Sequence, residues 1–158
     1  MYTVPMQEKR RGCKLRKGRM SIAGQIYLVT CVTRQRENLF SELSMGRIVV
    51  KEMSQSECYG ASETLAFVIM PDHFHWLMTV GSPYTLSKII CGVKSHSARM
   101  VNHRLRRHGA VWQRGFHDHA LRRDEDILHV ARYIIANPLR AGLVKRVGDY
   151  PLWDAAWL

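Results

Sequence analysis

Apolar and polar positions along this chain follow two periods, which together predict the order of helices and strands. Helices are predicted where apolar residues recur at helical spacing, over residues 41–57, 86–105 and 124–136. Runs rich in β-branched and aromatic side chains predict strands over residues 26–33, 62–70, 73–80 and 111–121. The last helix should end at Asn137-Pro138, because the residue before a proline avoids the helical region. The segment after Gly142 shows neither period and is expected to be irregular.

The predicted order is β-α-β-β-α-β, followed by one extra helix. This is the order of a ferredoxin-like α+β sandwich, in which an antiparallel sheet carries two helices on one face. A Pro-Asp turn joins the two middle strands and indicates a hairpin. In its second strand, alternation places Phe74 and Trp76 on one side of the sheet and His73 and His75 on the other. We therefore expect both imidazoles on the face that the helices leave open.

Basic residues outnumber acidic ones by 24 to 13, which gives a formal net charge of +11 and favours a polyanionic partner. They gather in the first 20 positions and in an acid-free stretch from residue 73 to residue 117. The residues expected to contact nucleic acid are Lys9, Arg10, Arg11, Lys14, Arg16, Lys17, Arg19, Lys94, Arg99 and Arg106. The alternative is a cationic surface that serves only solubility.

The 158 residues suffice for one domain with its own core. We expect a flexible basic arm over residues 1–24, a folded domain over residues 25–150 and a short tail over residues 151–158. Four cysteines are scattered without a C-x-x-C pair, and the longest apolar run, LAFVIM, is too short to span a bilayer. A soluble, cytoplasmic protein with reduced cysteines and no membrane segment is therefore expected.

Two histidine pairs have i, i+2 spacing: His73 with His75, and His117 with His119. Two imidazoles on one face of a strand are close enough to share a metal ion. With 8 histidines in the chain such a pair is a weak signal, and taken alone it is better explained by a polar strand edge or a phosphate contact. A further alternative joins all four imidazoles in one structural metal site.

The last predicted helix aligns a phenol with an amide. Tyr133 and Asn137 stand at i and i+4, on a face separate from the apolar stripe that includes Ala131 and Ile134. A phenol becomes a useful nucleophile toward phosphorus when a nearby cation or base lowers its pKa, and a metal on the histidines would supply that cation. The alternative is an ordinary amphipathic tyrosine with its hydroxyl at the surface.

Two stretches carry a resemblance to a known family. MPDHFHWLM resembles the HUH motif, and WQRGFHDHALRRDEDILHVARYIIANPLRAGLV resembles the C-terminal signature of REP-associated tyrosine transposases, relatives of the single-tyrosine transposases of small insertion sequences. The resemblance implies that His73 and His75 bind a catalytic Mg²⁺ or Mn²⁺, that Tyr133 is the nucleophile and that Asn137 is a third metal ligand. Asp118 and His119 match another recurrent pair of the family. The ending YPLWDAAWL departs from the serine-rich ending of the family.

The resemblance also implies a reaction. Such enzymes cleave single-stranded DNA at palindromic hairpins through a 5′-phosphotyrosine intermediate, and they rejoin strands when a 3′ hydroxyl attacks in reverse. Residues 25–150 would then be a catalytic domain of the HUH type, acting as a monomer rather than a homodimer and associating with the nucleoid when bound to DNA. The alternative is a domesticated relative that binds specific DNA sequences without cleaving them.

Overall fold

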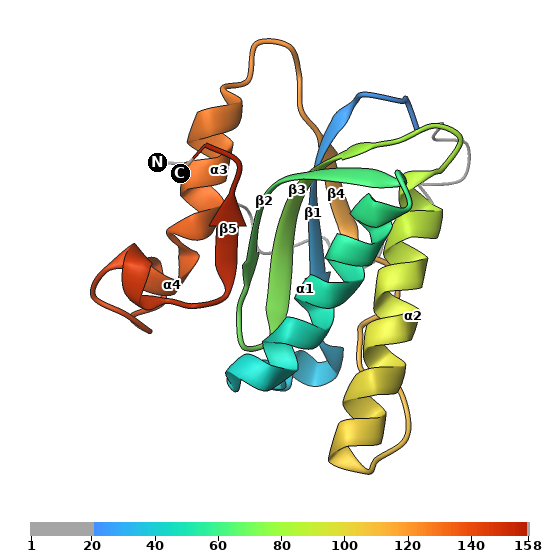
Figure 1. Cartoon of the computed structure of the whole chain (residues 1–158). Helices are drawn as coiled ribbons and strands as arrows, with labels where there is room; N and C mark the ends of the chain where they lie inside the picture. Colours follow the sequence, from blue (N-terminus) through green and yellow to red (C-terminus); the bar gives the residue numbers. More distant parts are fainter. Residues whose placement is uncertain (1–20, 158) are drawn as a thin grey trace.

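The computed structural model of the protein describes residues 21–157, which form a five-stranded sheet and its helices (Figure 1). The strands are β1 (Ile26–Val32), β2 (Ser62–Ile69), β3 (His73–Val80), β4 (His117–Ala120) and β5 (Trp153–Ala155). The helices are α1 (Leu43–Cys58), α2 (Leu86–Leu105), α3 (Ile127–Ile135) and α4 (Asn137–Arg140), with 3-10 turns at Arg34–Arg36 and Val147–Asp149.

The strands lie in the order β4-β1-β3-β2-β5, and each neighbouring pair is antiparallel. With α1 between β1 and β2, and α2 between β3 and β4, the first four strands form the ferredoxin-like arrangement. The predicted α+β sandwich is therefore confirmed. The strand β5 is an addition at the edge of the sheet, beside β2.

Two hydrophobic cores lie on opposite faces of the sheet. Alternation along β3 sends Phe74 and Trp76 beneath α1 and α2, where both are fully buried. Leu77 points to the other face and packs with Ile134 of α3. Figure 1 shows α1 and α2 side by side, with α3 apart from them. The face expected to stay open is therefore partly covered by α3, at the β2 side of the sheet.

The predicted strand over residues 111–121 is shorter in the structure. Only His117–Ala120 forms an extended ladder with β1. Trp112 makes an isolated bridge to Thr33 and inserts its indole into the core, where it stacks on Phe40 with 5.2 Å between ring centroids. Gly115 follows with a positive φ of 70° and breaks the extended run. Burial of an aromatic anchor thus prevails over strand propensity here.

Two predicted ends also differ. Pro138 does not end the helical region: α3 ends at Ile135, and the chain resumes a helix as α4, with the proline in its first turn. A proline is well tolerated there, because the backbone N–H groups of the first turn have no partner within the helix, so no helical hydrogen bond is lost. At the other terminus, Trp153–Ala155 pairs with β2, so the segment after Gly142 is not irregular throughout. Tyr150 helps to hold it, since its hydroxyl donates to the Ile69 carbonyl at 2.6 Å.

The part of the predicted arm that the structure describes is attached to the fold. The Gly24 amide donates to the Val80 carbonyl at 3.2 Å, and the Ser21 hydroxyl accepts from the Leu86 amide at 2.8 Å. The seven cations expected to bind nucleic acid between Lys9 and Arg19 lie outside the described residues. Within residues 21–157, no helix combines the length and the apolar character needed to cross a membrane.

Candidate active site

The two histidines of β3 stand side by side on the face opposite α1 and α2. Their ring centroids lie 5.0 Å apart, with the rings nearly perpendicular at 81°. Both side chains are partly exposed, whereas the intervening Phe74 is fully buried. The prediction that His73 and His75 point the same way is confirmed. Two imidazoles at this separation can converge on one ion or one phosphate.

Each imidazole is anchored through its Nδ1 atom. The Nδ1 of His73 lies 2.6 Å from Oδ1 of Asp72, and because a carboxylate only accepts, the ring is the donor. The Nδ1 of His75 lies 2.7 Å from Oγ1 of Thr30, its partner across the β1–β3 ladder. A hydroxyl can accept that proton, which leaves both Nε2 atoms with a lone pair. Anchoring of one ring nitrogen while the other faces a ligand is typical of metal-binding histidines.

The surroundings keep this pair suited to a cation. Burial, with the electrostatic effects of the neighbouring His73 and Arg140, lowers the pKa of His75 from its usual range to about 3. The ring is therefore neutral near pH 7, which is the form that binds metals. Burial alone would raise the pKa of Asp72, but its hydrogen bonds and charge interactions with His73 and Arg36 lower that pKa overall. Asp72 thus stays ionised as the acceptor for His73.

Tyr133 projects from the last turn of α3. Asp126 caps the start of that helix, since its carboxylate accepts from the amides of Leu128 and His129. Ile134 is fully buried against the sheet, while its neighbour Tyr133 is 47% exposed. The phenol is therefore not buried in the hydrophobic core, and a macromolecular ligand bound at the surface can reach it.

Arg140 links the groups that the sequence picked out separately. Its guanidinium carbon lies 4.0 Å from the centroid of the Tyr133 ring, and its Nη2 donates to Oδ1 of Asn137 at 2.6 Å. Its positive charge also acts on His75. One arginine therefore neighbours the candidate nucleophile, the candidate third ligand and the histidine pair. Sequence reasoning missed Arg140, although its i+3 spacing from Asn137 placed the two on one helical face.

The second histidine pair does not join the first. His119 donates through Nε2 to the carboxylate of Glu125, 2.9 Å from its Oε1 atom, on the loop before α3. His117 lies across β1 from His75, with Thr30 between them in register. Within residues 21–157, no three or more His, Cys, Asp or Glu side chains are grouped so that they could hold a metal ion. The alternative of a four-histidine structural metal site is therefore wrong.

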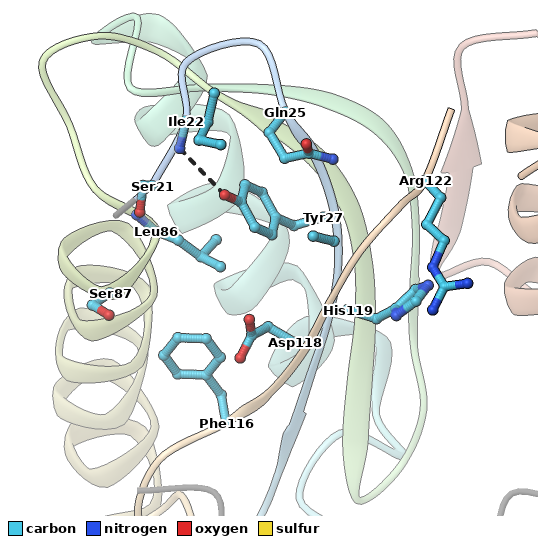
Figure 2. A pocket seen from close by; sticks show the side chains of 11 residues that line it. Ser21, Ile22, Gln25, Tyr27, Leu86, Ser87, Phe116, Asp118, His119 and Arg122 are labelled. Atoms are coloured by element: carbon cyan, nitrogen blue, oxygen red, sulfur yellow. Dashed lines mark hydrogen bonds between the residues drawn. The ribbon is translucent and has the colours of Figure 1, made fainter. Parts of the chain in front are cut away.

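Asp118 and His119, adjacent in sequence, serve opposite faces of the sheet. Figure 2 shows Asp118 pointing toward Phe116 and Leu86, and His119 pointing away toward Arg122. The pocket that Asp118 helps to line has a volume of about 360 Å³ and lies between β4 and the start of α2. Their side chains therefore point apart, although both residues border this pocket.

The candidate nucleic-acid cations in the described part of the chain lie on or just after α2, on the face opposite the histidines. Lys94 donates through Nζ to the carbonyls of Gln113 and Gly115, at 2.7 and 2.5 Å, so it tethers the loop that leads to β4. Arg99 is exposed, and Arg106 ends α2 in the left-handed region with φ 50°. Arg99 and Arg106 present charge to solvent, while Lys94 serves the fold.

Comparison with known proteins now identifies the family. A family model described as "Transposase IS200 like" matches residues 21–137. The chain belongs to this transposase family. The matched range includes His73, His75, Tyr133 and Asn137, and it ends before Arg140. The predicted class of enzyme, a tyrosine transposase, is confirmed.

Three relatives place this transposase more closely. A curated protein of Escherichia coli K12 named REP-associated tyrosine transposase is 28% identical over 139 residues, which cover 84% of this chain and 78% of that protein. A curated protein of Haemophilus influenzae is 29% identical over 142 residues, which cover 81% and 78%. A solved structure of a REP-associated tyrosine transposase bound to a REP hairpin superposes with a TM-score of 0.70 and 26% identity, over 85% of this chain and 79% of that one. The predicted resemblance to these enzymes is therefore confirmed.

The residues of the site fit a divalent cation of the kind expected. Two imidazole Nε2 atoms together with an oxygen donor make a mixed nitrogen and oxygen set, which suits Mn²⁺ and tolerates Mg²⁺. No third His, Cys, Asp or Glu among residues 21–157 completes a set with the pair that could hold a metal ion, so a third protein donor would have to be another kind of side chain. The Nδ2 atom of Asn137 is buried without a hydrogen-bond partner, so this amide is not fully satisfied by the protein alone.

Proposed function

We propose that this transposase is a metal-dependent enzyme that cleaves and rejoins single-stranded DNA at REP-type hairpins through a 5′-phosphotyrosine intermediate. The observation that carries the proposal is the placement of Arg140, which contacts Tyr133 and Asn137 and whose charge acts on His75. Arg140 thus links the proposed nucleophile and the proposed amide ligand to the histidine pair. Cleavage of a phosphodiester in a DNA chain would use all three groups.

The protein residues have separable roles. His73 and His75 would hold Mg²⁺ or Mn²⁺ through Nε2, with Asp72 and Thr30 fixing the two rings, and Asn137 would supply an oxygen. The cation, when bound, polarises the phosphate and offsets the charge that develops on the leaving oxygen. Tyr133 attacks phosphorus through its Oη atom and gives up its proton to solvent. The bond from phosphorus to the 3′ oxygen breaks, and that oxygen leaves as a 3′ hydroxyl after it gains a proton.

The reaction conserves the phosphodiester bond energy, so it runs in either direction. A 3′ hydroxyl from another DNA end attacks the phosphotyrosine, which restores a phosphodiester and releases the Tyr133 phenol. Strand transfer therefore needs no nucleotide cofactor. The exposed position of Tyr133 suits this cycle, because a buried phenol could not exchange one strand for another.

The substrate assignment rests on charge and on the relative whose structure contains a REP hairpin. A net charge of +11 favours DNA binding, and Arg99 and Arg106 are exposed cations available to the phosphates of a duplex stem. The helix that carries Tyr133 and the strand that carries the histidines pack together in one core through Ile134 and Leu77. We therefore propose a monomer that acts in cis on DNA in the cytoplasm, at the nucleoid.

A covalent-adduct assay tests this proposal. The protein is incubated with Mn²⁺ and REP-type single-stranded hairpin oligonucleotides labelled at the 3′ end, and then run on a denaturing gel. Wild type is expected to give a labelled band that migrates above free protein, while Tyr133→Phe binds the hairpin and gives no adduct. Hairpin binding without an adduct from wild type, in either Mg²⁺ or Mn²⁺, would instead show a domesticated DNA-binding protein.

A further inference from the structure

The Asn137 amide cannot serve the protein and a metal in its present hydrogen-bonding state. Its Oδ1 atom already accepts from the Arg140 guanidinium at 2.6 Å, a short charge-assisted hydrogen bond. An amide oxygen has two lone pairs, but a guanidinium and a divalent cation on one oxygen would stand only a few Å apart. Their repulsion across such a distance is strong, even with partial solvent screening. Metal binding at Asn137 therefore requires Arg140 to move.

The hydrogen bonds of the Asn137 amide show which residue determines its orientation. Among buried side-chain polar atoms of residues 21–157, Asn137 Nδ2 stands out because it has no hydrogen-bond partner. A buried amide normally turns to satisfy both ends. Here the guanidinium fixes the oxygen and the nitrogen is left without an acceptor, so Arg140 rather than the surrounding fold determines the orientation. Once the arginine leaves, the amide can rotate.

Arg140 is able to leave. Its side chain is exposed, and its other contact is the face of Tyr133, itself 47% exposed. Hydrogen bonds and cation–π contacts at exposed sites are individually weak. A DNA phosphate is a stronger partner for a planar guanidinium, because its two free oxygens match the arginine fork. When DNA binds, its phosphate can therefore replace Asn137 and Tyr133 as the interaction partner of the Arg140 guanidinium.

We propose that Arg140 is a positioning residue that couples metal binding to DNA binding. In the DNA-free protein it occupies Asn137 Oδ1 and contributes a positive charge beside the histidines, so it weakens the affinity for the divalent cation. A DNA phosphate draws the guanidinium away, which frees both Asn137 and the ring of Tyr133 for the substrate. By linkage, the metal strengthens DNA binding by the same factor. This inference rests on the proposed function, since it takes Asn137 as a ligand.

Manganese binding without turnover provides the test. The free Mn²⁺ concentration is measured by electron paramagnetic resonance, with every variant in the Tyr133→Phe background so that DNA is not cleaved. Without DNA, Arg140→Ala is expected to bind Mn²⁺ about tenfold more tightly than its parent. This is the change in affinity that corresponds to the free energy of one charge-assisted hydrogen bond. Arg132→Ala, which removes an equal charge from α3, is expected to change the affinity by less than about threefold.

Two further arms separate a ligand effect from a structural one. In an Asn137→Ala background, Arg140→Ala is expected to lose most of its tenfold effect, because no amide oxygen is left to free. Addition of a REP-type hairpin oligonucleotide is expected to tighten Mn²⁺ binding more in the parent than in Arg140→Ala. Equal or weaker Mn²⁺ binding by Arg140→Ala without DNA would overturn the inference. The metal site of the proposed function would instead be overturned if no variant bound Mn²⁺, or if replacement of His73 and His75 left Mn²⁺ binding unchanged.

Discussion

The carboxylate of Asp72 lies 2.6 Å from Nδ1 of His73, at the turn that joins β2 to β3. This contact explains why an acid precedes the first histidine in MPDHFHWLM. The turn also fixes the backbone of Asp72, since the Asp72 carbonyl accepts from the Thr33 amide at 2.8 Å and from its hydroxyl at 2.9 Å. Asp72 is therefore held in place as the anchor of His73.

Replacement of Asp72 should weaken metal binding without touching a ligand. Loss of a partner that orients a metal-binding histidine typically lowers affinity by about 10- to 100-fold, and we expect this range for Asp72→Ala with Mn²⁺. Asp72→Asn keeps an acceptor oxygen and should lose less. Manganese titration followed by electron paramagnetic resonance measures both variants. Wild-type affinity in Asp72→Ala would show that the contact has no role in metal binding.

The stability of the metal-free protein should fall on acidification because of His75. The pKa of His75 is lowered to about 3 in the fold, while an unfolded histidine titrates near 6.5. Between these values the unfolded chain binds a proton that the folded chain does not, so the free energy of unfolding decreases as pH falls. One such group contributes a slope of up to about 1.4 kcal/mol per pH unit. Urea denaturation at pH 7, 6, 5 and 4 measures the slope, and His75→Gln should reduce it by about this amount.

The two tyrosines that follow Ile127 should separate function from stability. The Tyr150 hydroxyl donates to the Ile69 carbonyl at 2.6 Å, so Tyr150→Phe should lower the free energy of unfolding by about 1 kcal/mol. It should form the DNA adduct as wild type does, whereas Tyr133→Phe should form none and lose little stability, because Tyr133 is 47% exposed. Urea denaturation and the adduct gel together check this pair. Loss of the adduct in folded Tyr150→Phe would contradict the assignment of roles.

The salt dependence of hairpin binding should report phosphate contacts of α2. If Arg99 neutralises one phosphate, Arg99→Gln should reduce the slope of log affinity against log salt by about 0.7 to 0.9. Arg146→Gln is a matched control, because Arg146 forms an ion pair with Asp149 at 3.1 Å in the chain after α4. Fluorescence anisotropy between about 50 and 300 mM salt measures the slopes. Equal slopes in wild type and Arg99→Gln would remove Arg99 from the DNA interface.

The sequence was sufficient for the elements whose local pattern and long-range packing agree. Alternation along β3 predicted which face holds the histidines, and the core cluster of Phe74 and Trp76 follows it. Where the two disagree, prediction failed. Trp112 leaves the ladder to fill a core site beside Phe40, and Trp153 enters the sheet at an edge that only the tertiary fold provides.

The site shows the same division. Same-face placement of His73 and His75 follows from the two-residue period, but Thr30 is 45 positions away from its partner His75, and no local pattern could pair them. The link between Arg140 and Asn137 was accessible from their helical spacing. The proximity of Arg140 to His75 was not, because it depends on how α3 and α4 pack on the sheet.

The attachment site of DNA on the protein tests the central claim most directly. The adduct formed with a REP-type hairpin and Mn²⁺ is digested with nuclease and protease, and the peptide that carries the residual nucleotide is identified by mass spectrometry. The account predicts a 5′-nucleotide on Tyr133, and loss of the modified peptide when His73 and His75 are both replaced by alanine. A nucleotide on any other residue, or an adduct that persists without the two histidines, would contradict it.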